Sequence, residues 1–286
     1  MLFIKKWKHL SSFHENEYKL NSTLAKVAAK KANLQELSKI YTHIDSESIN
    51  QFFQSIPNIK NFIKGNGIDL GGGPGIVSAT LVNNFPEIKN IILLELVYEV
   101  LENCFPIVKN NLLEQKLVDK VIPVCGSFDE LKLENKSLDF AIFWDSLHHS
   151  LNPSNTLKEI RRVLKNTGYL IIIDRAHNNR TSQKEIYRML NIIYSRKFLK
   201  DNFLPIDTIL TRRQNGENEY RFKDWEKFFR ESKFDIFYKG LYLEKHPRNI
   251  NYQNDAGICQ KYISIELGGF EKRKVVYILK SHKQLK

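Results

Sequence analysis

Apolar residues change their spacing twice along the chain. From about residue 15 to residue 64 they recur every three or four positions, as at Leu20, Leu24 and Val27, which predicts amphipathic helices. Asp45 stands directly before another apolar run in this stretch and predicts a helix start there. Short apolar runs then alternate with helical stretches until about residue 175, where the helical spacing returns.

Five short and nearly continuous apolar runs predict buried strands. They occupy residues 67–70, 90–94, 121–124, 138–143 and 169–173. Turns and helical stretches separate them, which favours βαβ units and strands covered by helices on both faces. Two later runs, 234–243 and 274–279, predict the final strands. The sequence therefore predicts an α/β fold with a doubly wound, seven-stranded, mostly parallel sheet.

Two helical regions depart from this alternation. Residues 1–66 form a helical extension ahead of the first strand. Residues 176–233 form a helical insertion before the sixth strand, with helices expected at 183–200 and 223–232. Both regions could fold over the strand ends as a lid. Inside the sheet region, the run 157–168 predicts a helix closed by its final glycine.

Composition is that of an ordinary folded protein. Of the 286 residues 42% are hydrophobic and 27% charged, and no apolar run approaches the roughly 18 residues of a membrane-spanning helix. At the N-terminus the charges follow a short apolar stretch, the reverse of a secretory signal. Cys104, Cys125 and Cys259 are odd in number and lack metal-ligand spacing. These features favour three ordinary thiols in a cytoplasmic protein without a membrane span.

The formal net charge of +12 is unevenly spread. The net is +5 over residues 1–66, −4 over 67–174 and +11 over 175–286. A basic C-terminal region could attract nucleic acid, an anionic lipid surface or a phosphorylated small molecule. The alternative is compositional, because the whole chain is rich in Lys, Asn and Ile and has no dense basic run. A nucleic-acid partner therefore stays open but is not favoured, and the oligomeric state is undetermined.

The most informative motif is the glycine-rich turn from Asp69 to Gly75 at the end of the first predicted strand. Glycine lets a ligand approach the backbone closely, and the helix expected at 76–84 points its N–H groups at the loop. A dinucleotide fingerprint counted from the first glycine would require glycine at position 76, where the chain has Ile76. The pattern that fits is D-x-G-x-G-x-G. Its fixed positions are Asp69, Gly71, Gly73 and Gly75, and Gly72 lies between the first two glycines.

This loop resembles the first motif of the class I S-adenosylmethionine-dependent methyltransferases. The resemblance extends over the order of features from residue 67 to about 175 and implies a Rossmann-like methyltransferase fold with S-adenosylmethionine as cofactor. It also implies that Asp69 and the glycine backbone surround the methionine part of that cofactor. A carboxylate there can attract the ammonium or sulfonium charge, while backbone N–H groups receive the carboxylate. The alternative for Asp69 is a residue that only stabilises the turn.

An acidic residue ends the second predicted strand. Glu95 lies about 20 residues past the loop, where a carboxylate can accept hydrogen bonds from both ribose hydroxyls. Dinucleotide enzymes share this requirement, so Glu95 supports an adenosine ligand without selecting the family. Glu99, one helical turn later, is the alternative, and Leu96 joins Glu95 among the residues expected at the cofactor.

The adenine end departs from the family pattern. Methyltransferases of this type often have an aspartate at the position of Ser127, followed by an apolar residue against the ring. Here Ser127 can offer its hydroxyl or backbone and Phe128 can pack on the adenine. Asp129 could substitute only if the loop is shifted. The alternative for Phe128 is simple core packing.

The fourth predicted strand ends in chemistry-bearing side chains. Residues 140–149 run from the strand into Asp145 and the pair His148 and His149, similar to many small-molecule methyltransferases. Either histidine could act as general base, and either could instead pack structurally. Asp145 is expected at the methionine end of the cofactor or at the substrate. No metal is expected, because Arg175 stands where a further ligand would be needed.

The resemblance divides the chain into four parts. They are an N-terminal cap at 1–66, an S-adenosylmethionine-binding core at 67–175, a lid on the substrate side at 176–233, and the last two strands at 234–286. The expected function is methyl transfer to an oxygen or nitrogen of a small molecule, such as a secondary metabolite or a sugar or cell-surface precursor. The alternatives are an RNA methyltransferase that uses the basic C-terminal region and a non-catalytic module that only binds.

Overall fold

A single nine-stranded sheet organises the part of the chain that the computed structural model describes, residues 3–7, 15–31, 33–202, 204–243, 246–251 and 273–282. The strands are β1 Lys5–Lys6, β2 Gly65–Leu70, β3 Ile88–Glu95, β4 Val121–Cys125, β5 Leu138–Trp144, β6 Leu164–Asp174, β7 Phe234–Leu243, β8 His246–Asn251 and β9 Arg273–Ser281. They follow the order β1-β4-β3-β2-β5-β6-β9-β7-β8. The pairs from β1 to β6 are parallel, whereas β9 lies antiparallel between β6 and β7.

The seven predicted strands and the mostly parallel, doubly wound sheet are confirmed, with β1 and β8 as additions. The strand order reverses at β2, which pairs with β3 on one side and with β5 on the other. In such sheets ligands collect outside the carboxyl ends of the strands at the reversal point. The glycine loop, which follows β2, therefore lies at the expected place for a ligand.

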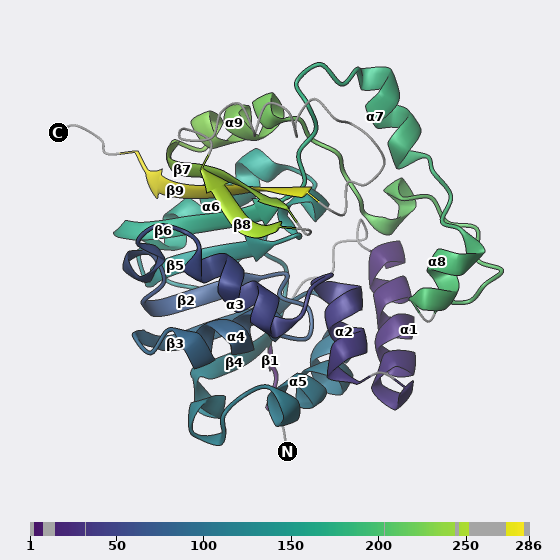
Figure 1. Ribbon diagram of the computed structural model, residues 1–286, viewed down its shortest axis with the longest axis horizontal. Coiled ribbons are helices and arrows are strands. Elements are labelled where there is room, and N and C mark those ends of the chain that lie inside the picture. The colour runs from purple at the N-terminus through teal and green to yellow at the C-terminus, as the bar shows by residue number, and fades with distance from the viewer. Residues whose placement is uncertain are drawn as a thin grey trace.

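Helices cover both faces of the sheet (Figure 1). The helices are α1 Glu15–Lys31, α2 Leu34–Tyr41, α3 Ser46–Gln54, α4 Ile76–Asn84, α5 Phe105–Asn111, α6 Pro153–Val163, α7 Gln183–Leu190, α8 Arg196–Asp201 and α9 Phe222–Glu231. Successive β5 side chains point to opposite faces. Phe140 and Ile142 belong to the core under α3, α4 and α5, while Ala141 and Phe143 belong to the core under α6 and α9.

The expected helical extension and insertion are both present. Asp45 caps α3, where its carboxylate accepts a hydrogen bond from the backbone N–H of Ser48 at 2.7 Å. The helix expected at 183–200 is interrupted, because α7 ends at Leu190 and α8 begins at Arg196. In Figure 1 the helices α1, α2 and α8 lie together beyond one end of the strands, as a lid would require.

The glycine cap predicted for the helix at 157–168 is wrong. Helix α6 ends at Val163, and the chain enters β6 directly at Leu164, whose backbone is extended. Gly168 instead lies in the strand, where an added Cβ would stand 2.9 Å from the carbonyl oxygen of Asp139. The glycine is needed for close backbone approach, not for a left-handed helix end.

Two of the three cysteines lie among the described residues. Cys104 and Cys125 are free thiols, and burial raises the pKa of each to about 11. Cys259 lies outside the described residues. Over the described ranges, no helix has the length and apolar character needed to cross a membrane.

Candidate functional site

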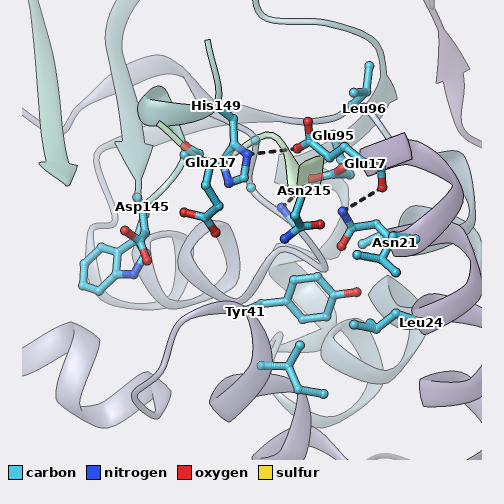
Figure 2. A pocket seen from close by; sticks show the side chains of 18 of the residues that line it. Glu17, Asn21, Leu24, Tyr41, Glu95, Leu96, Asp145, His149, Asn215 and Glu217 are labelled. Carbon is cyan, nitrogen blue, oxygen red and sulfur yellow. Dashed lines mark hydrogen bonds and ion pairs between the residues drawn. The ribbon is translucent and has the colours of Figure 1, made fainter. Parts of the chain in front are cut away.

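A cavity of about 250 Å³ opens at the carboxyl ends of the parallel strands, where the strand order reverses (Figure 2). Eight of the ten predicted cofactor-binding residues line it: Gly71, Gly72, Gly73, Glu95, Leu96, Ser127, Phe128 and Asp145. Asp69 and Gly75 do not line it. Helices α1 and α2 and the insertion supply further walls, so the N-terminal extension, the sheet region and the insertion all line the cavity.

The glycine loop has the backbone that its sequence requires. Gly71, Gly73 and Gly75 have φ values of 68°, 54° and 86°, a region that side chains with a Cβ rarely adopt. A Cβ on Gly71 would stand 2.9 Å from Cβ of Ser146, and one on Gly73 would stand 3.0 Å from the Tyr41 ring. Gly71 and Gly73 therefore present backbone without a side chain to the cavity, which suits close approach of a ligand. The N–H groups of Gly71 and Gly73 already donate to the Leu94 carbonyl oxygen and to Glu95, so the N–H contacts expected for the cofactor carboxylate do not fit these two residues.

Gly75 serves the loop in another way. It is the N-terminal cap of α4, and an added Cβ would stand 2.6 Å from Leu93 and 3.2 Å from Phe105. Its small size therefore allows α4 to pack closely on the sheet. The expectation that Gly75 itself contacts the cofactor does not agree with this position, because the residue lies behind the cavity wall.

Asp69 also lies beneath the loop and outside the cavity. Its side chain is fully buried, and Oδ2 accepts a hydrogen bond from the Ser78 hydroxyl at 2.7 Å. Ser78 lies in the first turn of α4, where a carboxylate complements the helix dipole. Burial raises the pKa of Asp69 to about 6, against the hydrogen bonds from Ser78. The geometry thus favours the alternative assignment of Asp69, as a residue that joins the loop to α4.

Glu95 occupies the position expected of the ribose ligand. It is half-buried and lines the cavity, and its oxygens accept hydrogen bonds from the backbone N–H groups of Gly73 at 3.0 Å and Val97 at 2.9 Å. Burial raises the pKa of Glu95 to about 7, although those hydrogen bonds favour the ionised form. Glu99 lies outside the cavity and accepts a hydrogen bond from the Tyr18 hydroxyl at 3.0 Å. Of the two candidates, only Glu95 faces the cavity.

Ser127 and Phe128 both line the cavity next to Leu96. The Phe128 ring also meets the ring of Phe143 edge-on, with centroids 5.5 Å apart, so it packs on the core and faces the cavity at once. Asp129 is engaged elsewhere, by the Thr156 hydroxyl. The loop is therefore not shifted in the way that would let Asp129 replace Ser127.

The two histidines after β5 have different surroundings. His148 is buried and does not line the cavity, and its Nδ1 lies 2.8 Å from Asp174 Oδ1 while Nε2 lies 2.8 Å from the Arg175 guanidinium. His149 lines the cavity, with Nδ1 3.1 Å from Glu17 Oε1. Only His149 can therefore meet a molecule in the cavity, and the expected catalytic role for His148 does not fit its burial.

The protonation of His148 is decided by its geometry. Burial and the Arg175 charge act to lower the pKa of His148 and oppose protonation, whereas Asp174 and Glu217 favour the protonated ring. A guanidinium can only donate, however, so the short contact with Arg175 makes Nε2 an acceptor. We therefore favour the neutral ring with its proton on Nδ1, facing Asp174.

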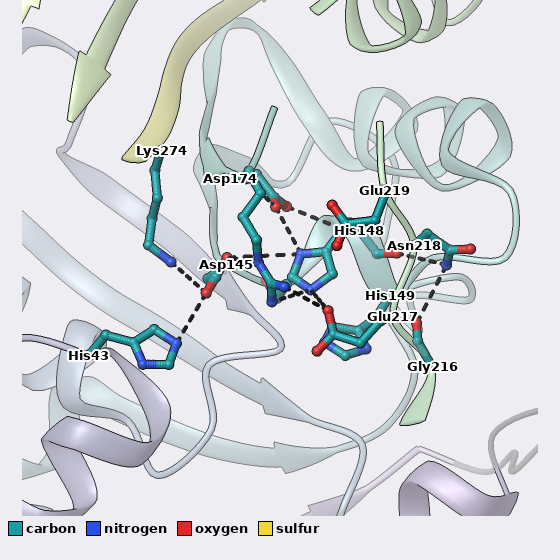
Figure 3. Close-up of polar contacts among 12 residues, drawn as sticks. His43, Asp145, His148, His149, Asp174, Gly216, Glu217, Asn218, Glu219 and Lys274 are labelled. Carbon is teal, nitrogen blue, oxygen red and sulfur yellow. Dashed lines mark hydrogen bonds and ion pairs between the residues drawn. The ribbon is translucent and has the colours of Figure 1, made fainter. Parts of the chain in front are cut away.

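Asp145 is the centre of a buried ion network (Figure 3). It has a φ of 53°, unusual for a residue with a side chain, and it lines the cavity. Its carboxylate meets Arg175 Nε at 3.0 Å, His43 at 3.5 Å and the buried Lys274 ammonium. Burial would raise the pKa of Asp145, but the charges of Arg175 and Lys274 hold it well below its usual range.

Arg175 affects whether a metal ion could bind beside the cavity. Two sets of possible metal ligands occur among the described residues, and within each set the ligand atoms lie within 4.8 Å of one another. The first set is His148, His149 and Glu217, and the second is Asp145, His148 and Asp174. The Arg175 guanidinium lies among them and donates to Asp145 and to Glu217, the latter at 2.7 Å. Its positive charge takes the place that a cation would need, so we keep the expectation of a site without metal.

The insertion supplies seven residues of the cavity wall: Tyr194, Phe198, Asn202, Leu204, Arg212, Asn215 and Glu217. Several aromatic and basic residues of the insertion are engaged away from the cavity: His177 binds Glu219, Arg213 lies over the Tyr187 ring, Tyr220 packs on Trp225, and Arg221 binds Asp224.

Among the lining residues, three were not predicted from the sequence: Glu17 of α1, Tyr41 of α2 and Glu217 of the insertion. Glu17 and Tyr41 lie on ordinary amphipathic helices and Glu217 lies in a loop, so none stands in a recognisable motif. They meet at one cavity only because distant segments of the chain pack together.

Comparison with known proteins agrees with this geometry. A family model described as a methyltransferase domain matches residues 68–172. A sarcosine/dimethylglycine N-methyltransferase of Aphanothece halophytica is 44% identical over 61 residues, and the match spans 22% of that relative and 21% of this chain.

Solved structures share the fold at low sequence identity. A putative sarcosine dimethylglycine methyltransferase from Galdieria sulphuraria superposes with a TM-score of 0.55 at 17% identity, over 82% of this chain and 85% of that chain. A complex between the Haloferax volcanii Trm112 methyltransferase activator and a putative methyltransferase gives 0.56 at 13% identity, over 91% of this chain and 98% of that chain. Identities this low establish the fold alone.

Proposed function

We propose that this chain, whose residues 68–172 are a methyltransferase domain of the S-adenosylmethionine-dependent class, transfers a methyl group to an oxygen or nitrogen of a small molecule. One observation carries the proposal. A single cavity brings the glycine loop and Glu95 together with His149, with walls from the N-terminal helices and the insertion.

The residues at the loop end fit S-adenosylmethionine. Bare backbone at Gly71 and Gly73 would leave room for the methionine part, the Glu95 carboxylate would hold the ribose hydroxyls, and the apolar side chains of Leu96 and Phe128 the adenine. The cofactor supplies a methyl group on positively charged sulfur. The task of the chain is to align the acceptor and to exclude water, which the enclosing α1 and insertion serve.

The acceptor end favours an uncharged or amine-bearing molecule. Its arginines are already neutralised, Arg175 by Asp145 and Glu217, and Arg212 by Glu217 and Glu219. An anionic acceptor would therefore find no uncommitted arginine among the described lining residues. A hydroxyl or a protonated amine must lose a proton on methylation, and His149 is the residue placed to receive it.

A transfer assay with radiolabelled S-adenosylmethionine tests the proposal. Small amines and phenols without a carboxylate are compared with the amino acids sarcosine and dimethylglycine and with total RNA as acceptors. We expect label in a small molecule. Label in RNA instead would favour the basic C-terminal region as a nucleic-acid surface, with binding that falls steeply as salt rises. Cofactor binding without transfer to any acceptor would favour a binding module.

Replacing Glu95 with glutamine should weaken S-adenosylmethionine binding about tenfold, because a charged acceptor of hydrogen bonds becomes neutral. The pKa of Glu95 is raised to about 7, so its carboxylate is ionised above that pH and protonated below it. The affinity of the unaltered chain should therefore fall as pH drops from about 8 to about 6, whereas that of Glu95→Gln should stay flat. Calorimetric titration at several pH values measures both effects.

Glu99→Gln is the matched control, since Glu99 lies one turn further on and outside the cavity. It should bind with unchanged affinity and keep the pH dependence. If Glu99→Gln lost affinity and Glu95→Gln did not, the placement of the ribose would be wrong.

A further inference from the structure

A carboxylate from the N-terminal extension contacts the histidine that lines the cavity. Glu17 lies on α1, and its Oε1 is 3.1 Å from Nδ1 of His149 (Figure 2). The Nδ1 atom is buried and makes no hydrogen bond of regular geometry, so its contact with Glu17 is an electrostatic one at short range. The His149 side chain as a whole keeps 21% of its surface exposed. The exposed part of the ring therefore lies away from Glu17, on the side of the cavity.

The insertion closes over this pair. A Cβ on Gly216 would stand 2.5 Å from Glu17 Oε2 and 3.2 Å from His149 Nδ1, and Gly216 has a φ of +80°. Two residues further on, the Asn218 side-chain amide donates a hydrogen bond to the His148 carbonyl oxygen at 2.8 Å. The turn that carries His149 is thus held between α1 and the insertion, neither of which belongs to the matched methyltransferase segment.

We propose that Glu17 is a positioning residue that fixes His149 as the general base, with Nδ1–H facing Glu17 and the Nε2 lone pair facing the acceptor. A carboxylate at one ring nitrogen selects the tautomer that carries its proton there, which leaves the other nitrogen basic. The inference rests on the proposed methyl transfer and adds the residue that orients its base.

The proton balance is simple. The proton leaves the acceptor's oxygen or nitrogen for Nε2, and the electrons of the broken O–H or N–H bond stay on the acceptor. His149 then becomes a cation beside Glu17 on one side, with a Glu217 oxygen within 4.8 Å of a ring nitrogen on the other. Glu95 and the His148 ring, whose centroid is 4.3 Å away, complete its titratable surroundings. Carboxylates on two sides stabilise that cation.

The tautomer can be measured without an acceptor. Long-range proton–nitrogen correlation spectra of the full chain, with ¹⁵N-labelled histidine, distinguish Nδ1–H from Nε2–H rings, and His149→Gln assigns the signal. We expect the Nδ1–H pattern in the unaltered chain and its loss in Glu17→Ala. Glu17→Gln should keep it, because the amide oxygen can face Nδ1–H as the carboxylate does. An Nε2–H ring in the unaltered chain would overturn the proposal.

Two comparisons distinguish the orienting role of Glu17 from the proposed methyl transfer on which it rests. Glu15→Gln, on the same helix but exposed and paired only with Lys19 among the described residues, should leave the His149 signal unchanged. Once an acceptor is known, Glu17→Ala should lower kcat by about 100-fold, the low end for loss of a general base. Failure of the unaltered chain to bind S-adenosylmethionine would reject the proposed function while leaving the measured tautomer as it stands.

Discussion

Replacing Gly73 with valine is expected to weaken binding of S-adenosylmethionine by about 100-fold. Gly73 has a φ of 54°, which a β-branched residue adopts only with strain of about 1–3 kcal/mol. The new side chain would also enter the cavity, where its Cβ alone stands 3.0 Å from the Tyr41 ring. In addition, the Gly73 N–H donates to Glu95, so a shifted loop would move both ends of the cofactor site. Calorimetric titration measures the loss.

Gly65→Val is the matched control. Gly65 stands at the opposite end of β2, also with positive φ, and a Cβ there would lie 2.3 Å from the Asp139 carboxylate. Both variants should therefore lower the melting temperature, but only the change at Gly73 should reduce affinity. Full affinity in Gly73→Val would contradict the position assigned to the cofactor.

Replacing Arg175 with methionine is expected to lower the free energy of unfolding by about 3–5 kcal/mol, the usual cost of breaking a buried ion pair. Arg175 donates to Asp145 and Glu217, two carboxylates that burial keeps from water. Lys274 and Arg212 would remain near them, which limits the loss. Urea unfolding followed by circular dichroism measures the difference.

Lys197→Met removes an ion pair of the opposite kind. Lys197 is 82% exposed and meets Asp201 one turn along α8, so its loss should change stability by less than about 1 kcal/mol. Equally small losses in the two variants would mean that water reaches the Arg175 network.

Local patterns in the sequence determined the sheet and the cofactor end of the site. Continuous apolar runs located the seven main strands, Asp45 located the start of α3, and the glycine spacing located the loop beside Glu95. Each of these signals is contained in a few neighbouring residues, because it depends on backbone geometry and on burial of adjacent positions. The two-residue strand β1 is too short to carry such a signal.

Other features depend on contacts between distant segments. Nothing near Asp69 indicates that its carboxylate turns toward Ser78 instead of the cavity. Similarly, Glu17 and Glu217 are ordinary polar positions in their own helix and loop, and only the packing of the extension and insertion brings them to His149. The catalytic assignment could therefore be narrowed to one histidine only from the three-dimensional arrangement.

The central claim is that the glycine loop and Glu95 form one adenosylmethionine site, and direct titration of the unaltered chain with S-adenosylmethionine tests it. The account predicts saturable binding of one cofactor per chain, weakened by about 100-fold in Gly73→Val. At roughly 1 mM cofactor, binding with a free energy more favourable than about −4 kcal/mol would be detected. The absence of binding heat at that concentration would contradict the claim.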